Sequence, residues 1–130
     1  MRKPTIYVAG PMRGYENWNY EAFDRQAKAL EEAGWVVINP GEMDREYTQE
    51  LVDTTPFDFD PTINYHDQEF LRKVLSRDMN FICKDCTAIY MMKGWERSKG
   101  AKAEWSLAKA LGLDIFYEVP LPPETIGKLV

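Results

Sequence analysis

The sequence is poor in the residues that bind metal ions or span membranes, and each scarcity excludes a class of protein. It contains one histidine and two cysteines. Cys83 and Cys86 form a single C-x-x-C pair, and a zinc site needs two more ligands than this pair provides. No apolar run approaches the roughly 18 residues of a membrane span. We therefore expect no metal ion, no membrane contact and two reduced cysteines in a structural role.

Positive charge is also scarce, because 16 lysines and arginines are outnumbered by 21 aspartates and glutamates, for a net charge of −5. This balance argues against binding of nucleic acid, which needs a basic patch, but it permits a small anionic ligand at a local site. The N-terminal segment has too short an apolar stretch for a signal peptide, so we expect a cytoplasmic protein. A chain of 130 residues is the usual size of one domain and can bury a core without disulfides.

Short apolar segments alternate along the chain with longer amphipathic ones. The apolar segments, which we predict to be strands, are residues 5–10, 35–40, 87–92 and 114–119. The amphipathic segments, which we predict to be helices, are residues 19–35, 66–86 and 98–112. The alternation predicts one α/β domain over residues 1–130, with a parallel sheet and helices on both of its faces. Residues 41–65 lack a clean period, which predicts a loop or lid inserted into that domain.

The helix expected at 98–112 carries a carboxylate on its apolar side. At roughly 100° of rotation per residue, one inward arc of this helix contains Ala101, Trp105, Ala108, Leu111 and Gly112. Glu104 lies inside this arc, whereas the lysines of the helix lie opposite. Carboxylates are almost never fully buried unless they are paired or functional. Glu104 is therefore a candidate either for a hydrogen bond in the core or for a functional site.

The helix expected at 66–86 shows the same anomaly. Asp78 falls on an apolar stripe, four residues after Val74 and four before Ile82. A single inward carboxylate is usually a hydrogen-bonding group of the core, but two of them, on the helices before and after one strand, point to a shared site. Paired carboxylates in a partly dry site have their pKa values pushed apart, so that one can act as nucleophile and the other as acid. This chemistry breaks a bond at a sugar anomeric carbon.

A glycine-bearing turn follows the first expected strand. It consists of Gly10, Pro11, Met12, Arg13 and Gly14. Ligands of open α/β sheets bind at the carboxyl ends of the strands, where backbone N–H groups and an arginine can hold an anion. A tight turn that needs glycine for backbone reasons alone explains the same residues.

Four further residues are candidates for the site. Ser98 and Gly100 open the last expected helix, where a hydroxyl beside a small residue fits either a phosphate site or a plain N-cap. Trp95 lies in a turn where we expect no core for it to fill, so it either stacks on a ligand, joins a subunit contact or folds back on the surface. Tyr7, on the first strand, belongs either to the core or, through its hydroxyl, to the site.

Three segments together resemble a known family. IYVAGPMRG, SRDMNFICKDCTAIYMM and SKGAKAEWSLAKALGLDIFYE are similar to the nucleoside 2-deoxyribosyltransferase-like superfamily, which includes the 2′-deoxynucleoside 5′-monophosphate N-hydrolases. The resemblance spans nearly the whole chain but skips 41–65, and it includes a small branch common in phages and bacteria. It implies a flavodoxin-like parallel sheet of five strands, so with the four strands found above we expect four to five. It also implies catalysis without a cofactor and a homodimer or larger homo-oligomer.

The resemblance assigns roles to the candidate residues. It makes Glu104 the nucleophile that attacks C1′ of deoxyribose, Asp78 the proton donor to the leaving base and Tyr7 an active-site tyrosine. It makes the turn at 10–14 the sugar-phosphate loop and Ser98 the ligand of the 5′-phosphate. The 41–65 segment and the turn KGWER depart from the characterised enzymes of the superfamily, which leaves the base preference open.

Three hypotheses follow from these patterns. The first is an enzyme that cleaves the N-glycosidic bond of a 2′-deoxynucleoside 5′-monophosphate or a deoxynucleoside, by hydrolysis or by deoxyribosyl transfer. The second is a nucleotide-binding protein without turnover, which senses or sequesters its ligand. The third is a structural subunit in which the inward carboxylates pair with Arg13, Arg72 or Arg77 and leave no open site.

Overall fold

The computed structural model describes residues 4–12, 14–43 and 68–119. Within these ranges the strands are β1 (Thr5–Ala9), β2 (Val36–Ile38), β3 (Ala88–Met91) and β4 (Asp114–Tyr117). The helices are α1 (Tyr20–Glu32), α3 (Gln68–Lys84) and α4 (Lys99–Leu111), with short 3-10 helices η1 (Glu16–Asn19) and η2 (Trp95–Arg97). Each strand and each long helix falls within the segment predicted for it. None of the helices in these ranges has the length and apolar character needed to cross a bilayer.

The four strands form one parallel sheet in the order β2-β1-β3-β4. In this sheet Tyr7 of β1 pairs with Ile38 of β2 on one side and with Ile89 of β3 on the other. Because β1 and β3 are neighbours, the chain changes direction across the sheet at this pair of strands. Ligands of open α/β sheets bind at such a switch point, beyond the carboxyl ends of the strands. The α/β fold with a parallel, flavodoxin-like sheet is therefore confirmed.

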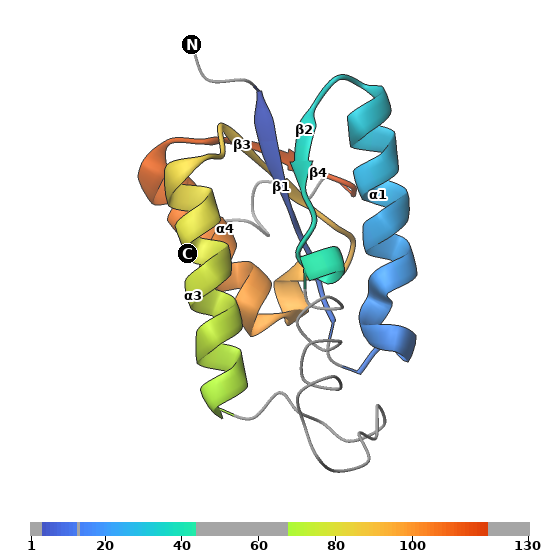
Figure 1. Cartoon of the computed structure of the whole chain (residues 1–130), viewed down its shortest axis with the longest axis vertical. Helices are drawn as coiled ribbons and strands as arrows, with labels where there is room; N and C mark the ends of the chain where they lie inside the picture. The colour runs from blue at the N-terminus through green and yellow to red at the C-terminus, as the bar shows by residue number, and fades with distance from the viewer. Residues whose placement is uncertain (1–3, 13, 44–67, 120–130) are drawn as a thin grey trace.

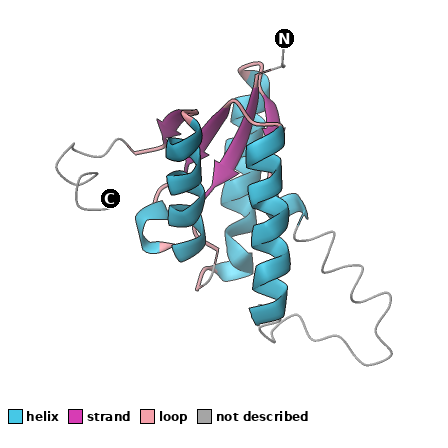
Figure 2. Ribbon diagram, turned by 90° about the vertical axis from the view of Figure 1, so that its left-hand side faces the viewer, coloured by secondary structure: helices cyan, strands magenta, loops and turns pink. Residues whose placement is uncertain are grey.

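Helices cover both faces of the sheet, as predicted (Figure 1). The helix α1 packs on one face, while α3 and α4 lie side by side on the other (Figure 2). The core on the α3 and α4 face includes Tyr7, Ile89 and Trp105. The smaller core on the α1 face is built around Val8, with Phe23. Side chains therefore alternate between the two faces along β1, as they do along any strand.

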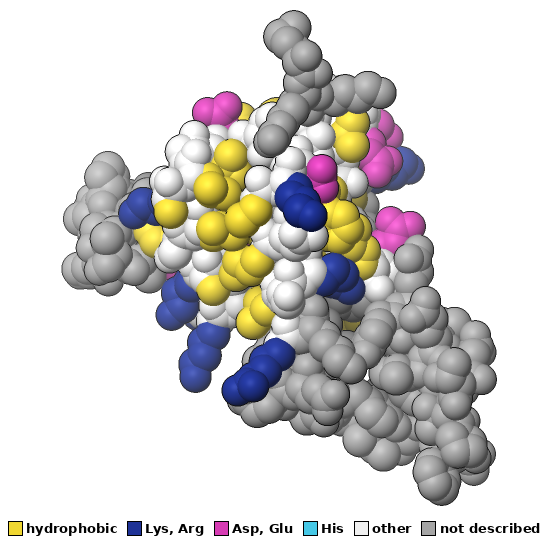
Figure 3. All heavy atoms as spheres, turned by 60° about the vertical axis from the view of Figure 1, so that its left-hand side comes forward, with side chains coloured by type: hydrophobic (Ala, Val, Ile, Leu, Met, Phe, Trp, Pro, Cys, Tyr) yellow, Lys and Arg dark blue, Asp and Glu magenta, His cyan; other side chains and the backbone are white. Residues whose placement is uncertain are grey.

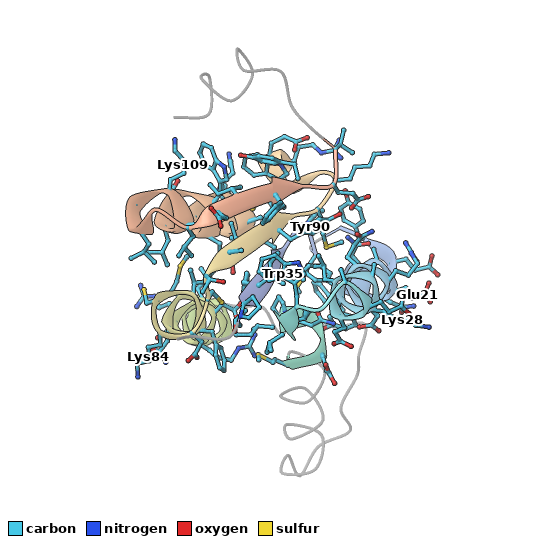
Figure 4. All side chains as sticks on the ribbon, turned by 90° about the horizontal axis from the view of Figure 1, so that it is seen from above. Glu21, Lys28, Trp35, Lys84, Tyr90 and Lys109 are labelled. Atoms are coloured by element: carbon cyan, nitrogen blue, oxygen red, sulfur yellow. The ribbon has the colours of Figure 1, made fainter. Side chains whose placement is uncertain are left out.

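A hydrogen bond links α1 to the sheet. The Tyr90 hydroxyl of β3 donates to Oε1 of Gln26 at 2.9 Å. Trp35, just before β2, meets Phe116 of β4 edge to face at 5.8 Å between ring centroids. Figure 4 looks down on this arrangement, with Trp35 and Tyr90 labelled near α1. The edge strand β4 nevertheless leaves Phe116 44% exposed, because α1 contacts β2 and β1 rather than β4.

Two local expectations are wrong. Trp95 was expected to have no core to fill, but it is only 2% exposed. Leu111 was placed on the inward arc of the last helix, but it is 45% exposed because α4 ends there, at Gly112. The lid predicted for 41–65 lies outside the described residues except for 41–43, which are helical. The described residues contain four strands. The fifth strand that the resemblance implies stays a prediction for the 41–65 segment or the C-terminal tail, which lie largely outside them.

Candidate functional site

The two inward carboxylates meet at one tyrosine. Tyr7 lies in the middle of β1 and is fully buried. Its hydroxyl donates a hydrogen bond to Oε2 of Glu104, which lies in the second turn of α4 and is 5% exposed. The sequence left Tyr7 either in the core or in the site, and the structure places its ring in the core and its hydroxyl on the carboxylate.

Asp78 approaches the same hydroxyl from α3. It is 4% exposed, as its position on the apolar stripe predicts. Its Oδ1 accepts a hydrogen bond from Nε of Arg77 at 2.9 Å and forms an ion pair with Nη2 of Arg77 at 2.7 Å. Arg77 was named in the third hypothesis as a possible partner of an inward carboxylate, and for Asp78 this pairing is present. Arg72 is exposed, and Arg13 lies outside the described residues.

The protonation of this cluster follows from its burial. Burial raises the pKa of Tyr7 well above its ordinary value, and the negative charges of Glu104 and Asp78 raise it further. Tyr7 is therefore a neutral hydrogen-bond donor at any working pH. Burial also raises the pKa of Asp78, while the charge and hydrogen bonds of Arg77 act in the opposite direction. A carboxylic acid with a raised pKa is suited to general acid catalysis, and a second carboxyl group lies beside it.

The turn after β1 packs against the turn after β3. A Cβ added to Gly10 would lie 2.8 Å from Cβ of Met92. The two turns therefore approach one another closely enough to require glycine at this position. Gly94 has a φ of +88°, and a Cβ there would lie 3.0 Å from the Tyr15 hydroxyl and 3.3 Å from Cγ of Pro11. Close packing of the two turns thus accounts for glycine at position 10, and the role of this turn in binding an anion stays a prediction. The two turns border the switch point of the sheet, where a ligand of this fold binds.

Strained backbone follows the same turn. Asn17, Trp18 and Asn19 have φ values of 49°, 55° and 63°, a left-handed run that L-residues rarely adopt. Hydrogen bonds from the Trp18 amide to the Tyr15 carbonyl, at 3.1 Å, and from Nδ2 of Asn19 to the Pro11 carbonyl, at 2.9 Å, hold it. Strain of this kind gathers at functional sites. The one signal of this strain in the sequence is the pair of asparagines, because asparagine is the non-glycine residue that best tolerates such angles.

The start of α4 is built as an N-cap. Oγ of Ser98 accepts a hydrogen bond from the Ala101 amide at 3.2 Å, which confirms the capping role. Gly100 lies in the first turn of α4, where a Cβ would make only ordinary contact with Leu75 of α3, at 3.7 Å. The phosphate-binding role of Ser98 and Gly100 stays a prediction. Glu104 follows one turn after Gly100 on the same helix.

Trp95 belongs to an aromatic cluster beside this helix. Its ring lies 5.2 Å from that of Trp105 and 6.0 Å from that of Tyr117, between centroids. Nε1 of Trp105 donates to the Tyr117 hydroxyl at 3.0 Å, while Nε1 of Trp95 is buried with no hydrogen-bond partner in the described part of the chain. The cluster fixes the turn after β3 against α4. Stacking of Trp95 on a ligand stays a prediction.

Both cysteines are free. Cys86 is buried, as a structural cysteine is expected to be, whereas Cys83 is exposed. Burial, helped by the charge of Asp85, raises the pKa of the Cys86 thiol to about 12, so it stays protonated and unreactive. Among the described residues, no group of three or more acidic, histidine or cysteine side chains is placed to hold a metal ion.

The side of the molecule that carries α3 and α4 has exposed hydrophobic side chains (Figure 3). On α4 they include Ala103, Ala110 and Leu111, with Leu107 half-buried between them. This spacing forms a second apolar stripe on α4, away from the one that packs on the sheet. Contiguous apolar surface of this kind marks contact with another macromolecule when it is large enough.

The comparisons with known proteins identify a family and are silent on the chemistry. One family model, described as a domain of unknown function (DUF4406), matches residues 4–56 and 64–117. No curated protein matches the chain. The matched segments contain every strand and helix described above, together with the Tyr7, Asp78 and Glu104 cluster. The chain therefore belongs to the DUF4406 family of domains of unknown function.

Proposed function

We propose that this protein cleaves the N-glycosidic bond of a 2′-deoxynucleoside 5′-monophosphate. The observation that carries the proposal is the cluster in which the Tyr7 hydroxyl joins two buried carboxyl groups from two different helices. Burial of two carboxyl groups opposes folding unless they are paired or serve a function. Well-packed apolar residues fill a purely structural position at least as well. The resemblance to the nucleoside 2-deoxyribosyltransferase-like superfamily supports the same reading.

The proposed reaction runs in two displacements. An oxygen of Glu104 attacks C1′ of the deoxyribose, the bond from C1′ to the base nitrogen breaks, and its electron pair leaves with the base. Asp78, which is protonated at the start, gives its proton to that base. Asp78 then takes a proton from water, whose oxygen attacks C1′, breaks the ester and regenerates the Glu104 carboxylate. The covalent intermediate divides one difficult step into two easier ones.

Tyr7 has a supporting part in this scheme. Because it stays protonated, its hydroxyl donates to Oε2 of Glu104 and fixes the direction of the carboxylate. A neutral donor also leaves the negative charge on Glu104, where the attack needs it. Both carboxyl groups are nearly inaccessible, so we expect the substrate to reach them through a rearrangement at the site.

The choice of a monophosphate rests on the surroundings of the cluster. The amino end of α4 lies one turn before Glu104 and favours an anion, with Ser98 and Gly100 in its first residues. The turn at 10–14 lies at the carboxyl end of β1, next to the turn that contains Gly94. A nucleotide with its phosphate near these segments would place its sugar toward Glu104. Arg13, which lies outside the described residues, is the predicted charged contact to this phosphate.

The test is a turnover screen. The protein is incubated with each deoxynucleoside monophosphate and each free deoxynucleoside, and base release is followed by chromatography. Glu104→Gln is the test variant and Glu31→Gln, which changes an exposed glutamate on α1, is the matched control. Release from a monophosphate by the control but not by Glu104→Gln supports the proposal. Equal release by both variants overturns the role of Glu104, and thermal stabilisation by a nucleotide without release favours the binding protein instead.

We also propose that the chain acts as a homo-oligomer, as the resemblance implies. The exposed apolar stripe of α4, with Leu111 45% exposed, supports this proposal. Light scattering during gel filtration measures the mass in solution. A mass of two or more chains, reduced by Leu111→Glu, supports the assignment, whereas a monomeric mass for the unaltered protein rejects it.

A further inference from the structure

Arg77 makes a contact that its position on α3 does not favour. Adjacent residues of a helix point in directions about 100° apart, so Arg77 and Asp78 do not naturally face one another. Nevertheless both Nε and Nη2 of Arg77 reach a single oxygen, Oδ1 of Asp78. The side chain of Asp78 is 6% exposed and that of Arg77 is 26% exposed, so the guanidinium lies at the margin of the site and the carboxyl group inside it.

Two donors on one oxygen fix the orientation of the carboxyl group. A charge-assisted hydrogen bond is stronger and shorter than a neutral one, and a guanidinium holds its donors in a rigid plane. The hydrogen bond and the ion pair of Arg77 both end on Oδ1, so neither of them occupies Oδ2. Within the described residues, the groups that face Asp78 are Arg77 from its own helix and Tyr7 from β1, with Glu104 of α4 bound to that tyrosine.

We propose that Arg77 is a positioning residue for the cleavage proposed above: it holds Oδ1 of Asp78 and thereby presents Oδ2 to the leaving base. The inference rests on the proposed function, because it assigns the direction from which Asp78 delivers its proton. It adds a residue that touches neither the sugar nor the base. The pairing of Arg77 with Asp78 by itself suits a structural subunit. Under this proposal the pairing is part of the catalytic arrangement.

The same contact controls when Asp78 holds its proton. Burial favours the protonated form, whereas the charge of Arg77 favours the ionised form. Loss of the guanidinium therefore raises the pKa of Asp78. For a group that must be protonated to act, a higher pKa extends activity to higher pH, while the weaker acid transfers its proton more slowly.

The test uses Arg77→Gln and Arg77→Lys, with Arg72→Gln as the matched control on the exposed side of the same helix. Carbon-13 NMR of the aspartate carboxyl groups, assigned with Asp78→Asn, follows the titration of Asp78 without any substrate. The pH profile of kcat/KM for base release is measured in parallel. We expect Arg77→Gln to raise the titration midpoint of Asp78 and to move the alkaline limb of the kcat/KM profile to higher pH. We also expect kcat to fall about tenfold, because a charged hydrogen-bond donor is lost.

Arg77→Lys separates charge from geometry. Lysine keeps the positive charge but lacks the planar pair of donors, so we expect a smaller change in the midpoint with most of the loss in kcat. Arg72→Gln should change neither. An unchanged Asp78 midpoint in Arg77→Gln, or a changed midpoint with unaltered kcat and pH profile, overturns the inference.

The two proposals fail in different ways. If the unaltered protein releases base and both Arg77 variants behave like Arg72→Gln, only the role of Arg77 is lost. If the unaltered protein releases no base from any nucleotide or nucleoside, the proposed function falls and the positioning role falls with it. Circular dichroism of each variant establishes that it is folded, and the lysine variant carries the test if the glutamine variant is not.

Discussion

The Tyr7 hydroxyl donates a hydrogen bond to Oε2 of Glu104, although the two residues lie 97 positions apart in the chain. One comes from the strand β1 and the other from the helix α4, which packs across that strand. This contact explains why the amphipathic helix α4 has its one glutamate on the apolar side. Glu104 points inward because a buried hydroxyl meets it there, in the same cluster that Asp78 enters from α3.

Tyr7→Phe removes this hydroxyl and keeps the buried ring. We expect a loss of stability of about 1.5–3 kcal/mol, because a carboxylate loses its donor in the core. We expect kcat for base release to fall by tenfold or more, because Glu104 is no longer held in one direction. Chemical denaturation and steady-state kinetics measure the two effects. Tyr90→Phe is the control, since its hydroxyl binds Gln26 on the opposite face of the sheet. Equal losses of kcat in both variants would contradict the account.

Asp78→Asn is expected to stabilise the protein near neutral pH. The pKa of Asp78 is raised in the folded chain above its ordinary value of 3.8, so between these two values the folded chain binds more protons than the unfolded chain. Its stability therefore falls as the pH rises through this window. Asparagine removes that dependence while its side-chain oxygen can still accept from Arg77.

Thermal unfolding as a function of pH tests this expectation. The melting temperature of Asp78→Asn should exceed that of the unaltered protein at pH 7, and the difference should shrink as the pH falls toward 3.8. Asp114→Asn, at an exposed position on β4, controls for the change in net charge. A difference that is independent of pH, or an asparagine variant that is less stable at pH 7, would show that Asp78 is not a strained buried acid.

Gly94→Ala and Gly112→Ala separate backbone strain from the packing of the two turns. Both glycines have positive φ, +88° and +72°, so alanine costs about 1–2 kcal/mol at either position. A Cβ at Gly112 meets nothing within 4 Å, whereas one at Gly94 meets Tyr15, Arg97 and Pro11. We therefore expect a larger loss of melting temperature in Gly94→Ala than in Gly112→Ala, and a raised KM only in Gly94→Ala. Equal KM values would mean that the turn after β3 does not shape the ligand site.

The sequence predicts the fold well because its local and global signals agree. The strands are short apolar runs that end at glycine or proline, and the helices between them have clear apolar arcs. The predicted exposure of a side chain is wrong where a helix ends, or where residues distant in the sequence determine whether the side chain is buried. Leu111 is exposed because α4 stops beside it, and Trp95 is buried because Trp105 and Tyr117 supply a core that the turn itself does not.

The site was predictable in part for the same reason. Glu104 and Asp78 stand out because they interrupt apolar arcs, which the sequence alone reveals. The pairing of Tyr7 with Glu104 depends on how α4 crosses the sheet, and the strained angles at Asn17–Asn19 depend on backbone contacts with Pro11 and Tyr15. The sequence offers Arg77 as one of three possible partners of an inward carboxylate, but it does not single out the pair with Asp78, because the spacing rules of a helix discount contacts between adjacent residues.

Glu104 as the nucleophile is best tested by the mass of the protein after reaction with a 2′-fluorinated deoxynucleoside monophosphate, whose glycosyl ester hydrolyses slowly. We predict a mass increase equal to the substrate without its base, located by peptide mapping on Glu104 and absent from Glu104→Gln. Base release from this analogue with no added mass, or with the sugar attached to another residue, would contradict the assignment of Glu104 as the nucleophile.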